Sequence, residues 1–374
     1  AVQRQLVADV ELGTYLSGGL DSAGITAHAS SVLSELKSFT CGFDLSSASG
    51  LELAFDERKA SEELSARFGT EHYEMVLKAG DMERCMPTLA WHLEEPRVGQ
   101  SYPNFYAAKL ASRFVKVVLA GTGGDELFAG YPWRYVRSSE VSPGQSIEDL
   151  YFLRWQRLVS DSELERLLMP INHHVKDTHP REIFKSALAG LPRSGTRDED
   201  LINWSLTFEA STFLHSLLIV EDKLSMAHGL ETRVPFLDNE LVDFAMRCPA
   251  GLKIDLSRQS IRIDENTPGL KTSYVADDRA RGKLVLRDAL QGFLPTHVLV
   301  GPKQGFSAPD ASWFRGDSID FVRSLFFDRQ PRLADFLDLD TLRALVIDHL
   351  TGHRNRRLLV WSFINLEFWL ADHQ

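Results

Sequence analysis

The first third of the chain alternates strand-like and helix-like segments, and this alternation constrains the fold more than any other feature of the sequence. The segments expected to form strands are 12–16, 38–43, 71–77 and 114–120. The segments expected to form helices stand between these strands, at 23–36, 56–68 and 106–113. Strands that alternate with helices are typical of a parallel sheet covered by helices, so we predict an α/β core.

The character of the sequence changes beyond this first third. Long helical stretches such as 148–159 and 201–227 dominate, strand signals are few, and the polar segment 255–268 is expected to be a loop. We therefore expect residues 1–140 to form the α/β core. Residues 141–374 are expected to form a helical part that packs against the sheet and completes the site.

Composition excludes several classes of protein. The net charge of -11 argues against a general nucleic-acid or membrane-surface binder, which would normally present a basic face. No apolar run approaches the ~20 residues that span a bilayer. The three cysteines, Cys41, Cys85 and Cys248, are isolated, which disfavours a zinc site or a disulfide framework and favours a reducing, cytoplasmic setting.

A glycine-rich turn follows the first expected strand. It consists of Ser17, Gly18, Gly19, Leu20, Asp21 and Ser22. The glycines let the backbone turn tightly, and the N–H groups at the start of the next helix form an anion site. Asp21 would repel an anion unless a cation bridges them, and Mg²⁺ prefers oxygen ligands of this kind. The turn lacks the GxxxxGKS/T pattern and matches the SGGxDS pyrophosphate loop of ATP pyrophosphatases. The alternative is a serine-glycine turn capped by Asp21.

A second acidic motif, GTGGDELFAGY, follows the 114–120 strand. Ligands of parallel sheets bind beyond the carboxyl ends of the strands, so this motif and the SGGLDS turn can share one ligand. Asp125 would then be a second Mg²⁺ ligand facing Asp21. The alternative is a helix start at which acidic residues complement the helix dipole.

These motifs resemble asparagine synthetase. The similarity is to the C-terminal, ATP-dependent synthetase domain, and it extends over nearly the whole chain. The segments that carry it are LVADVELGTYLSGGLDS, FTCGFD, GTGGDELFAGY, EDKLSMAHGLETRVPFLD and GPKQGFSAPDASWFRG. β-Lactam and carbapenam synthetases and lasso-peptide cyclases share this domain, so the resemblance defines the type of reaction better than the substrate.

The resemblance implies roles for individual residues. Those expected to bind ATP are Leu16, Ser17, Gly18, Gly19, Asp21, Ser22, Gly42, Phe43, Gly121, Thr122 and Gly123. Asp21 and Asp125 would bind Mg²⁺, and Lys223 would contact phosphate. Lys303 occupies the position of an essential lysine over the α-phosphate, where a fixed cation would stabilise developing charge. The alternative for either lysine is a solvated surface charge.

Two positions depart from the family pattern. Asparagine synthetases commonly have a carboxylate at the position of Thr122, thought to assist attack by ammonia, and a threonine cannot be a general base at neutral pH. Glu94, Glu95 or Glu126 could substitute, or the acceptor is not aspartate. Arg97 stands where many relatives have an uncharged or aromatic residue, and it could bind a substrate carboxylate or phosphate or pair with Glu94.

The implied reaction has two steps. A carboxylate, most simply that of aspartate, attacks the α-phosphorus of Mg-ATP, and an amine, most simply ammonia, then displaces AMP to form an amide. The ammonia would come from a glutaminase domain or subunit, or from solution. The sequence is also compatible with a homo-oligomer. Alternatives are another acceptor, such as a uronic acid or a peptide, a non-catalytic regulatory nucleotide binder, and a tRNA-modifying pyrophosphatase, which the acidic composition disfavours.

Overall fold

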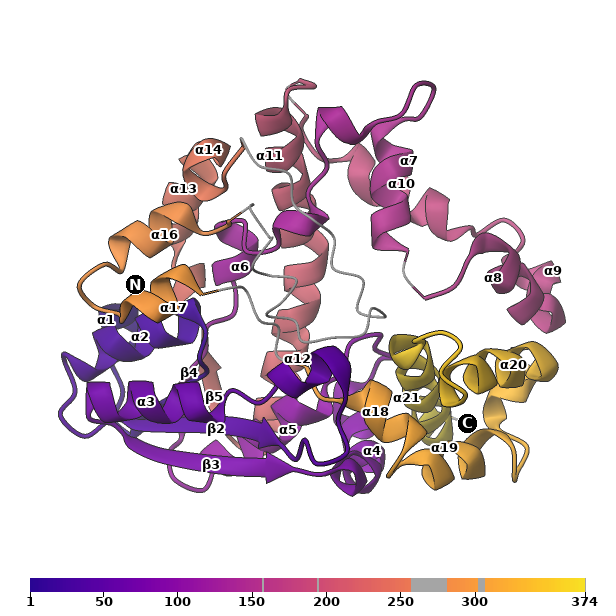
Figure 1. Cartoon of the computed structure of the whole chain (residues 1–374), viewed down its shortest axis with the longest axis horizontal. Helices are drawn as coiled ribbons and strands as arrows, with labels where there is room; N and C mark the ends of the chain where they lie inside the picture. Colours follow the sequence, from indigo (N-terminus) through magenta and orange to yellow (C-terminus); the bar gives the residue numbers. More distant parts are fainter. Residues whose placement is uncertain (157, 194, 257–280, 302–306, 374) are drawn as a thin grey trace.

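A five-stranded parallel sheet forms the centre of one half of the computed structural model (Figure 1). The structure describes residues 1–156, 158–193, 195–256, 281–301 and 307–373. In spatial order the strands are β3 (Glu71–Leu77), β2 (Lys37–Phe43), β1 (Leu12–Tyr15), β4 (Val117–Leu119) and β5 (Glu231–Arg233). The predicted class, a parallel α/β core with a large helical part, is therefore confirmed.

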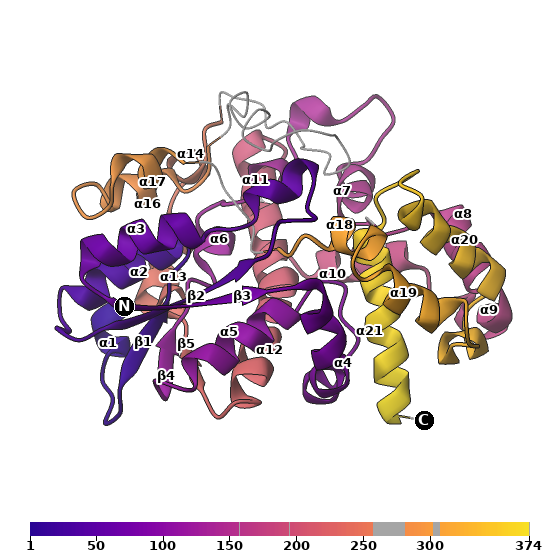
Figure 2. The same cartoon turned by 60° about the horizontal axis from the view of Figure 1, so that its bottom comes forward.

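Helices cover both faces of this sheet, as Figure 2 shows. Helices α2 (Leu20–Ser30) and α3 (Arg58–Phe68) contact strands β1 to β3 from one side. Helices α5 (Tyr102–Ala111) and α12 (His215–Met226) contact the sheet from the other side. Because both faces are covered, nearly every residue of β1, β2 and β4 is buried, including the polar side chains of Thr14, Ser38 and Thr40.

The strand order defines where a ligand can bind. From β1 the chain adds β2 and β3 on one side, and then returns to add β4 and β5 on the other side of β1. The loops that follow β1 and β4 therefore leave the sheet in opposite directions. A crevice between such loops is the usual ligand site of a doubly wound sheet.

The remaining helices lie around the sheet and in the other half of the molecule (Figure 1). Up to the end of β5 they are α1 (Val2–Gln5), α4 (Ala79–Leu93), α6 (Gly124–Leu127), α7 (Ile147–Trp155), α8 (Asp161–Leu167), α9 (Asn172–Val175), α10 (Pro180–Ala189) and α11 (Asp198–Glu209). After β5 they are α13 (Asn239–Arg247), α14 (Ala250–Lys253), α16 (Leu284–Ala289), α17 (Thr296–Val300), α18 (Asp310–Arg315), α19 (Ile319–Phe326), α20 (Leu339–Leu350) and α21 (Arg357–His373). Within the described ranges, none of the helices combines the length and hydrophobicity needed to cross a membrane.

One large apolar core joins the sheet to the C-terminal helices. Phe43 and Leu77, at the ends of β2 and β3, belong to the same buried cluster as Met86 of α4, Trp313 of α18 and Trp361 of α21. The rings of Phe43 and Trp313 meet edge to face, with centroids 6.3 Å apart. The carboxyl edge of the sheet is thereby fixed against the helical part, on the side where the site is built.

The structure also shows elements that the sequence does not predict. Helix α4 contains Pro87, which normally interrupts a helix. Its apolar face, including Met82 and Leu89, is buried in the large core and outweighs that penalty. Strand β5 is only three residues long, so it carries no readable alternation of polar and apolar residues.

Several expected boundaries differ from those observed. Helix α2 begins three residues before the predicted start at residue 23, and β4 is shorter than the predicted 114–120 strand. The stretch 201–227 is continuous, but a π-helical turn at Ala210–Leu214 separates α11 from α12. The expected loop 255–268 lies almost entirely outside the described residues.

A buried ion pair anchors α8 to the C-terminal helices. The Glu163 carboxylate accepts hydrogen bonds from Nη2 of Arg356 at 2.6 Å and from the Ser160 amide at 2.8 Å. Burial opposes the charged form of Glu163, but these hydrogen bonds outweigh it and lower the pKa to about 2. The carboxylate therefore contributes stability above its unfolded pKa, near 4.5, and this contribution is lost as the pH falls through about 2.

We predict that Glu163→Gln lowers the free energy of unfolding by about 1–3 kcal/mol at neutral pH, because Arg356 loses the nearer of its two carboxylate partners. The difference from wild type should shrink as the pH falls from 4.5 to 2, because over this range the carboxylate becomes protonated in the unfolded state while it stays charged in the folded state. Urea unfolding across this range measures both effects. Glu165→Gln, an exposed substitution on the same helix, should change neither.

Candidate functional site

The loops that follow β1 and β4 meet at the carboxyl edge of the sheet. A β-carbon on Gly121 would lie 3.1 Å from Cβ of Asp21 and 3.2 Å from the backbone nitrogen of Ser22. A β-carbon on Gly124 would lie 2.5 Å from Oδ1 of Asp21. The two glycines therefore allow the start of α6 to lie directly against the start of α2. The structure thus brings the two acidic motifs of the sequence together.

Two carboxylates from these loops converge on one buried ammonium group. Nζ of Lys283 lies 2.5 Å from Oδ1 of Asp125, and it also donates to Oδ2 of Asp21. The side chain of Lys283 is only 5% exposed, and those of Asp21 and Asp125 are 13% and 10% exposed. The Lys283 amide donates to the carbonyl of Phe128 at 2.9 Å, which fixes the lysine beside α6.

Lys283 is absent from the residues that the sequence predicts for the site. It stands 262 residues from Asp21 and outside the recognised motifs. The sequence feature that could have indicated Lys283 as a site residue is the pair Gly282–Lys283 directly before α16. Gly282 lies so close to the carbonyl of Ala129 that a β-carbon would be 1.9 Å from its oxygen. Sequence alone does not reveal that close approach.

The carboxylate pair has the chemistry of a cation site. Asp21 and Asp125 offer only oxygen ligands. The ammonium of Lys283 forms ion pairs with both carboxylates, so a cation can lie between them. Among the residues that the structure describes, no group of three or more His, Cys, Asp or Glu side chains could hold a metal ion. Two carboxylates fit Mg²⁺, which usually takes its other ligands from water and substrate phosphates.

The serine side chains shape the turn after β1. The Ser17 and Ser22 hydroxyl oxygens are 2.8 Å apart, and the Ser17 amide donates to the Ser22 hydroxyl at 3.0 Å. The Gly19 amide donates to the Ser17 hydroxyl at 3.2 Å. Gly19 is the N-cap of α2 and offers no capping side chain. A helix start of this kind presents N–H groups to an anion.

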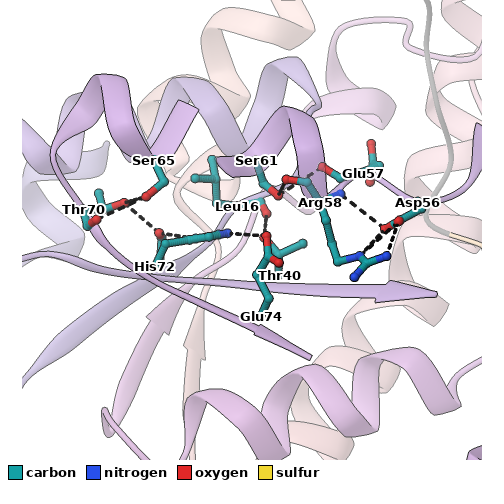
Figure 3. Close-up of polar contacts among 11 residues, drawn as sticks. Leu16, Thr40, Asp56, Glu57, Arg58, Ser61, Ser65, Thr70, His72 and Glu74 are labelled. Carbon is teal, nitrogen blue, oxygen red and sulfur yellow. Dashed lines mark hydrogen bonds and ion pairs between the residues drawn. The ribbon is translucent and has the colours of Figure 1, made fainter. Parts of the chain in front are cut away.

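The residues predicted to line the nucleotide lie along the same edge of the sheet. The side chains of Leu16 and Phe43 are buried, so their backbone is what can face a ligand. The Leu16 carbonyl accepts a hydrogen bond from the Thr40 hydroxyl, which joins the ends of β1 and β2 (Figure 3). Gly42 lies under Arg58, since a β-carbon there would be 2.5 Å from Cδ of that arginine.

Arg58 is itself fixed beside the end of β2. Its guanidinium makes a two-pronged ion pair with Asp56, with Nε and Nη2 at 2.9 and 2.7 Å from the two carboxylate oxygens (Figure 3). In the other loop, Gly123 has a φ of +99°, and a side chain there would meet Leu237 at 2.8 Å. The backbone of Gly123 therefore takes a conformation that favours glycine.

The residues predicted to be catalytic lie in different parts of the structure. Glu126 is buried beside Asp125 and accepts a hydrogen bond from the Tyr131 hydroxyl at 3.1 Å. Lys223 donates to the carbonyl of Leu93 at 2.7 Å and pairs with Glu94 at 2.9 Å, where α4 meets α12. A phosphate contact of Lys223 stays a prediction. Lys303 lies outside the described residues.

The alternative pair between Arg97 and Glu94 is wrong. Arg97 instead pairs with Glu95 at 3.2 Å and donates to the carbonyl and hydroxyl of Ser216 on α12, at 2.8 and 2.9 Å. Glu94 is engaged by Lys223. The side chain of Arg97 is 10% exposed, so it is largely enclosed by these contacts.

A further carboxylate that the sequence does not predict lies beside Thr122. Glu221 of α12 lies within hydrogen-bond reach of the Thr122 hydroxyl, and Tyr15 at the end of β1 is close enough to interact with its charge. Burial raises the pKa of Glu221 to about 7, and the Thr122 hydroxyl moderates this rise. As a whole residue, Glu221 is only partly buried.

Comparison with known proteins gives one family. The asparagine synthase family model matches residues 1–371. The chain is 28% identical over 407 aligned residues to a Mycobacterium bovis protein named "putative asparagine synthetase, glutamine-hydrolyzing", covering 99% of this chain and 56% of that protein. It is 26% identical to the glutamine-hydrolysing asparagine synthetase 1 of Bacillus subtilis, covering 99% of this chain and 57% of that protein. The chain thus spans little more than half the length of these relatives.

We predict that Gly124→Ala disables the site while leaving the fold intact. The added methyl group would displace the Asp21 carboxylate from Lys283, and a misplacement of about 1 Å can cost about 10²-fold in rate. ATP-dependent pyrophosphate release and thermal unfolding measure the two properties. Gly190→Ala is the control, because nothing lies within 4 Å of a β-carbon there. Equal activity in the two variants would contradict the close contact of the loops.

Proposed function

Because the chain belongs to the asparagine synthase family, we propose that it forms an amide from a carboxylate and an amine at the expense of ATP, with release of AMP and pyrophosphate. The observation that carries this proposal is the convergence of Asp21, Asp125 and Lys283 where the loops after β1 and β4 meet. A nucleotide bound beyond that edge of the sheet would place its phosphates against these charges.

Each part of the site has a role in the first step. The start of α2 and the turn at Ser17–Gly19 would bind the pyrophosphate portion of ATP. Asp21 and Asp125 would hold Mg²⁺, which when bound neutralises phosphate charge. The ammonium of Lys283 would leave the two carboxylates when Mg²⁺ binds them, and it would then contact the departing pyrophosphate. The chain thus orients the α-phosphorus for attack by the substrate carboxylate.

The most direct acceptor is aspartate, with ammonia as the amine. The relatives from Mycobacterium bovis and Bacillus subtilis bear names that include glutamine hydrolysis, and this chain covers 56% and 57% of them. Supply of ammonia by a glutaminase domain or subunit is therefore part of the proposal.

A second candidate is the same chemistry on another carboxylate, such as a uronic acid or a peptide. Thr122 supports this candidate, because asparagine synthetases commonly have a carboxylate at this position and a threonine cannot be a general base at neutral pH. A regulatory protein that binds nucleotide without turnover is the candidate of another class. Product release distinguishes it from both enzymes.

We predict that the protein releases AMP and pyrophosphate rather than ADP and phosphate, and that one carboxylic acid of a panel supports ATP–pyrophosphate exchange. The acid that supports exchange is the substrate. Asp21→Asn and Asp125→Asn should each nearly abolish exchange, because phosphate charge loses a compensating ligand. Asp243→Asn, an exposed substitution on α13, serves as the control. Stoichiometric ADP, or full exchange in either site variant, would contradict the proposal.

The role of Lys303 yields a separate prediction. A lysine that stabilises charge developing at the α-phosphate acts on the transition state more than on bound ATP. Lys303→Ala should therefore lower kcat by about 10²–10³-fold with little change in ATP affinity. Single-turnover kinetics and ATP titration measure these quantities. Weaker ATP binding at unchanged kcat would place the lysine on the ground-state phosphates instead.

A further inference from the structure

The second step of the proposed reaction needs a proton acceptor close to the α-phosphate. The nitrogen lone pair of the amine forms a bond to the acyl carbon of the adenylate, and an N–H proton must leave. The acyl C–O bond then breaks, and its electron pair departs with AMP. A side chain that accepts this proton has to reach the loop that follows β4 without being neutralised by a cation.

The other carboxylates near this region are already engaged. Asp21 and Asp125 meet the ammonium of Lys283, and Glu126 accepts a hydrogen bond from Tyr131. These contacts place the three carboxylates in the phosphate-binding and structural parts of the site.

The carboxylates at the junction of α4 and α12 are engaged as well. Glu95 pairs with Arg97 and Glu94 pairs with Lys223. These pairs also occupy the cations next to α12, since Arg97 is further held by Ser216. Glu221 differs from these carboxylates, because the influences on its pKa are burial and the Thr122 hydroxyl and include no cation.

Glu221 lies where such a group is needed. Its carboxylate faces Thr122, and Thr122 is the neighbour of Gly121, which contacts Asp21 and Ser22 in the nucleotide loop. Protein surrounds the carboxylate closely, while the residue as a whole is only partly buried. Ammonia could therefore reach it while bulk water is largely excluded.

We propose that Glu221 accepts the proton of the attacking amine, and that Thr122 positions its carboxylate. This inference rests on the proposed function and adds the catalytic base of its second step. The proton passes from the nitrogen to the Glu221 carboxylate as the amide forms, and it is later released to solvent.

The surroundings of Glu221 suit this role. Burial raises its pKa to about 7, so it can accept a proton at neutral pH and lose it again. Burial, together with the charge of Glu221, raises the pKa of Tyr15, so the tyrosine stays neutral and leaves the negative charge on the glutamate. The Thr122 hydroxyl favours the charged form of Glu221 and keeps its pKa from rising further.

The test separates the two steps of the reaction. Glu221→Gln should retain ATP–pyrophosphate exchange with the substrate acid and lose about 10²–10⁴-fold in ammonia-dependent amide formation. Hydroxylamine, which attacks acyl-adenylates without a base, should still give the hydroxamate at the wild-type rate. Asp222→Asn, an exposed neighbour on the same helix, should behave as wild type in all three assays.

The pH profile supplies the second readout. At a constant concentration of un-ionised ammonia, amide formation by the wild type should fall as the pH decreases below about 7, because protonated Glu221 accepts no proton. Thr122→Val should move this midpoint to higher pH, because the contact that favours the charged form is lost.

Three outcomes would overturn the inference: normal amide formation in Glu221→Gln, equal loss of exchange and amide formation in that variant, or an unshifted midpoint in Thr122→Val. Absence of exchange in the wild type with every acid would instead overturn the proposed function.

Discussion

The contact between two carboxylates and one buried ammonium determines how the rest of this site is arranged. Asp21 and Asp125 belong to loops that leave the sheet in opposite directions, and Lys283 holds both. Burying three charges is costly, and removing one partner of a buried ion pair typically costs about 3–5 kcal/mol. An apolar contact of the same size would join the loops with less desolvation. The charged arrangement is best explained by a ligand that carries both phosphate and a cation.

Helix α12 packs against the opposite face of the sheet and places Glu221 beside Thr122 in the loop that follows β4. The π-helical turn at Ala210–Leu214 adds one residue to the register between α11 and α12. One residue rotates a helix by roughly 100°, so the turn decides which side of α12 faces the sheet. In the observed register, Glu221 faces Thr122 while Ser216 and Lys223 bind groups beyond the end of α4. A local irregularity in one helix thus sets the positions of several functional groups.

Sequence patterns predicted the features that depend on local chemistry. The SGGLDS turn and the GTGGDELFAGY motif had to follow strands, and their glycines allow the contact that brings Asp21 against Gly124. The alternation of strands and helices predicted a parallel sheet covered by helices, and this is confirmed. Lys283 and Glu221 could not be predicted in the same way, because their partners are distant in sequence and no local pattern marks them. Helix α4 was equally hidden, since the tertiary burial of its apolar face outweighs the effect of Pro87.

The central claim is that the substrate carboxylate becomes bonded to the α-phosphorus of ATP. The most direct test uses the acid that supports exchange, labelled with ¹⁸O in its carboxylate, in a complete reaction with ATP and ammonia. Mass spectrometry of the nucleotide product then shows where the labelled oxygen goes. An acyl-adenylate intermediate transfers one ¹⁸O atom from the carboxylate to the phosphate of AMP. Label in inorganic phosphate, or unlabelled AMP alongside labelled amide formed at full yield, would contradict this account.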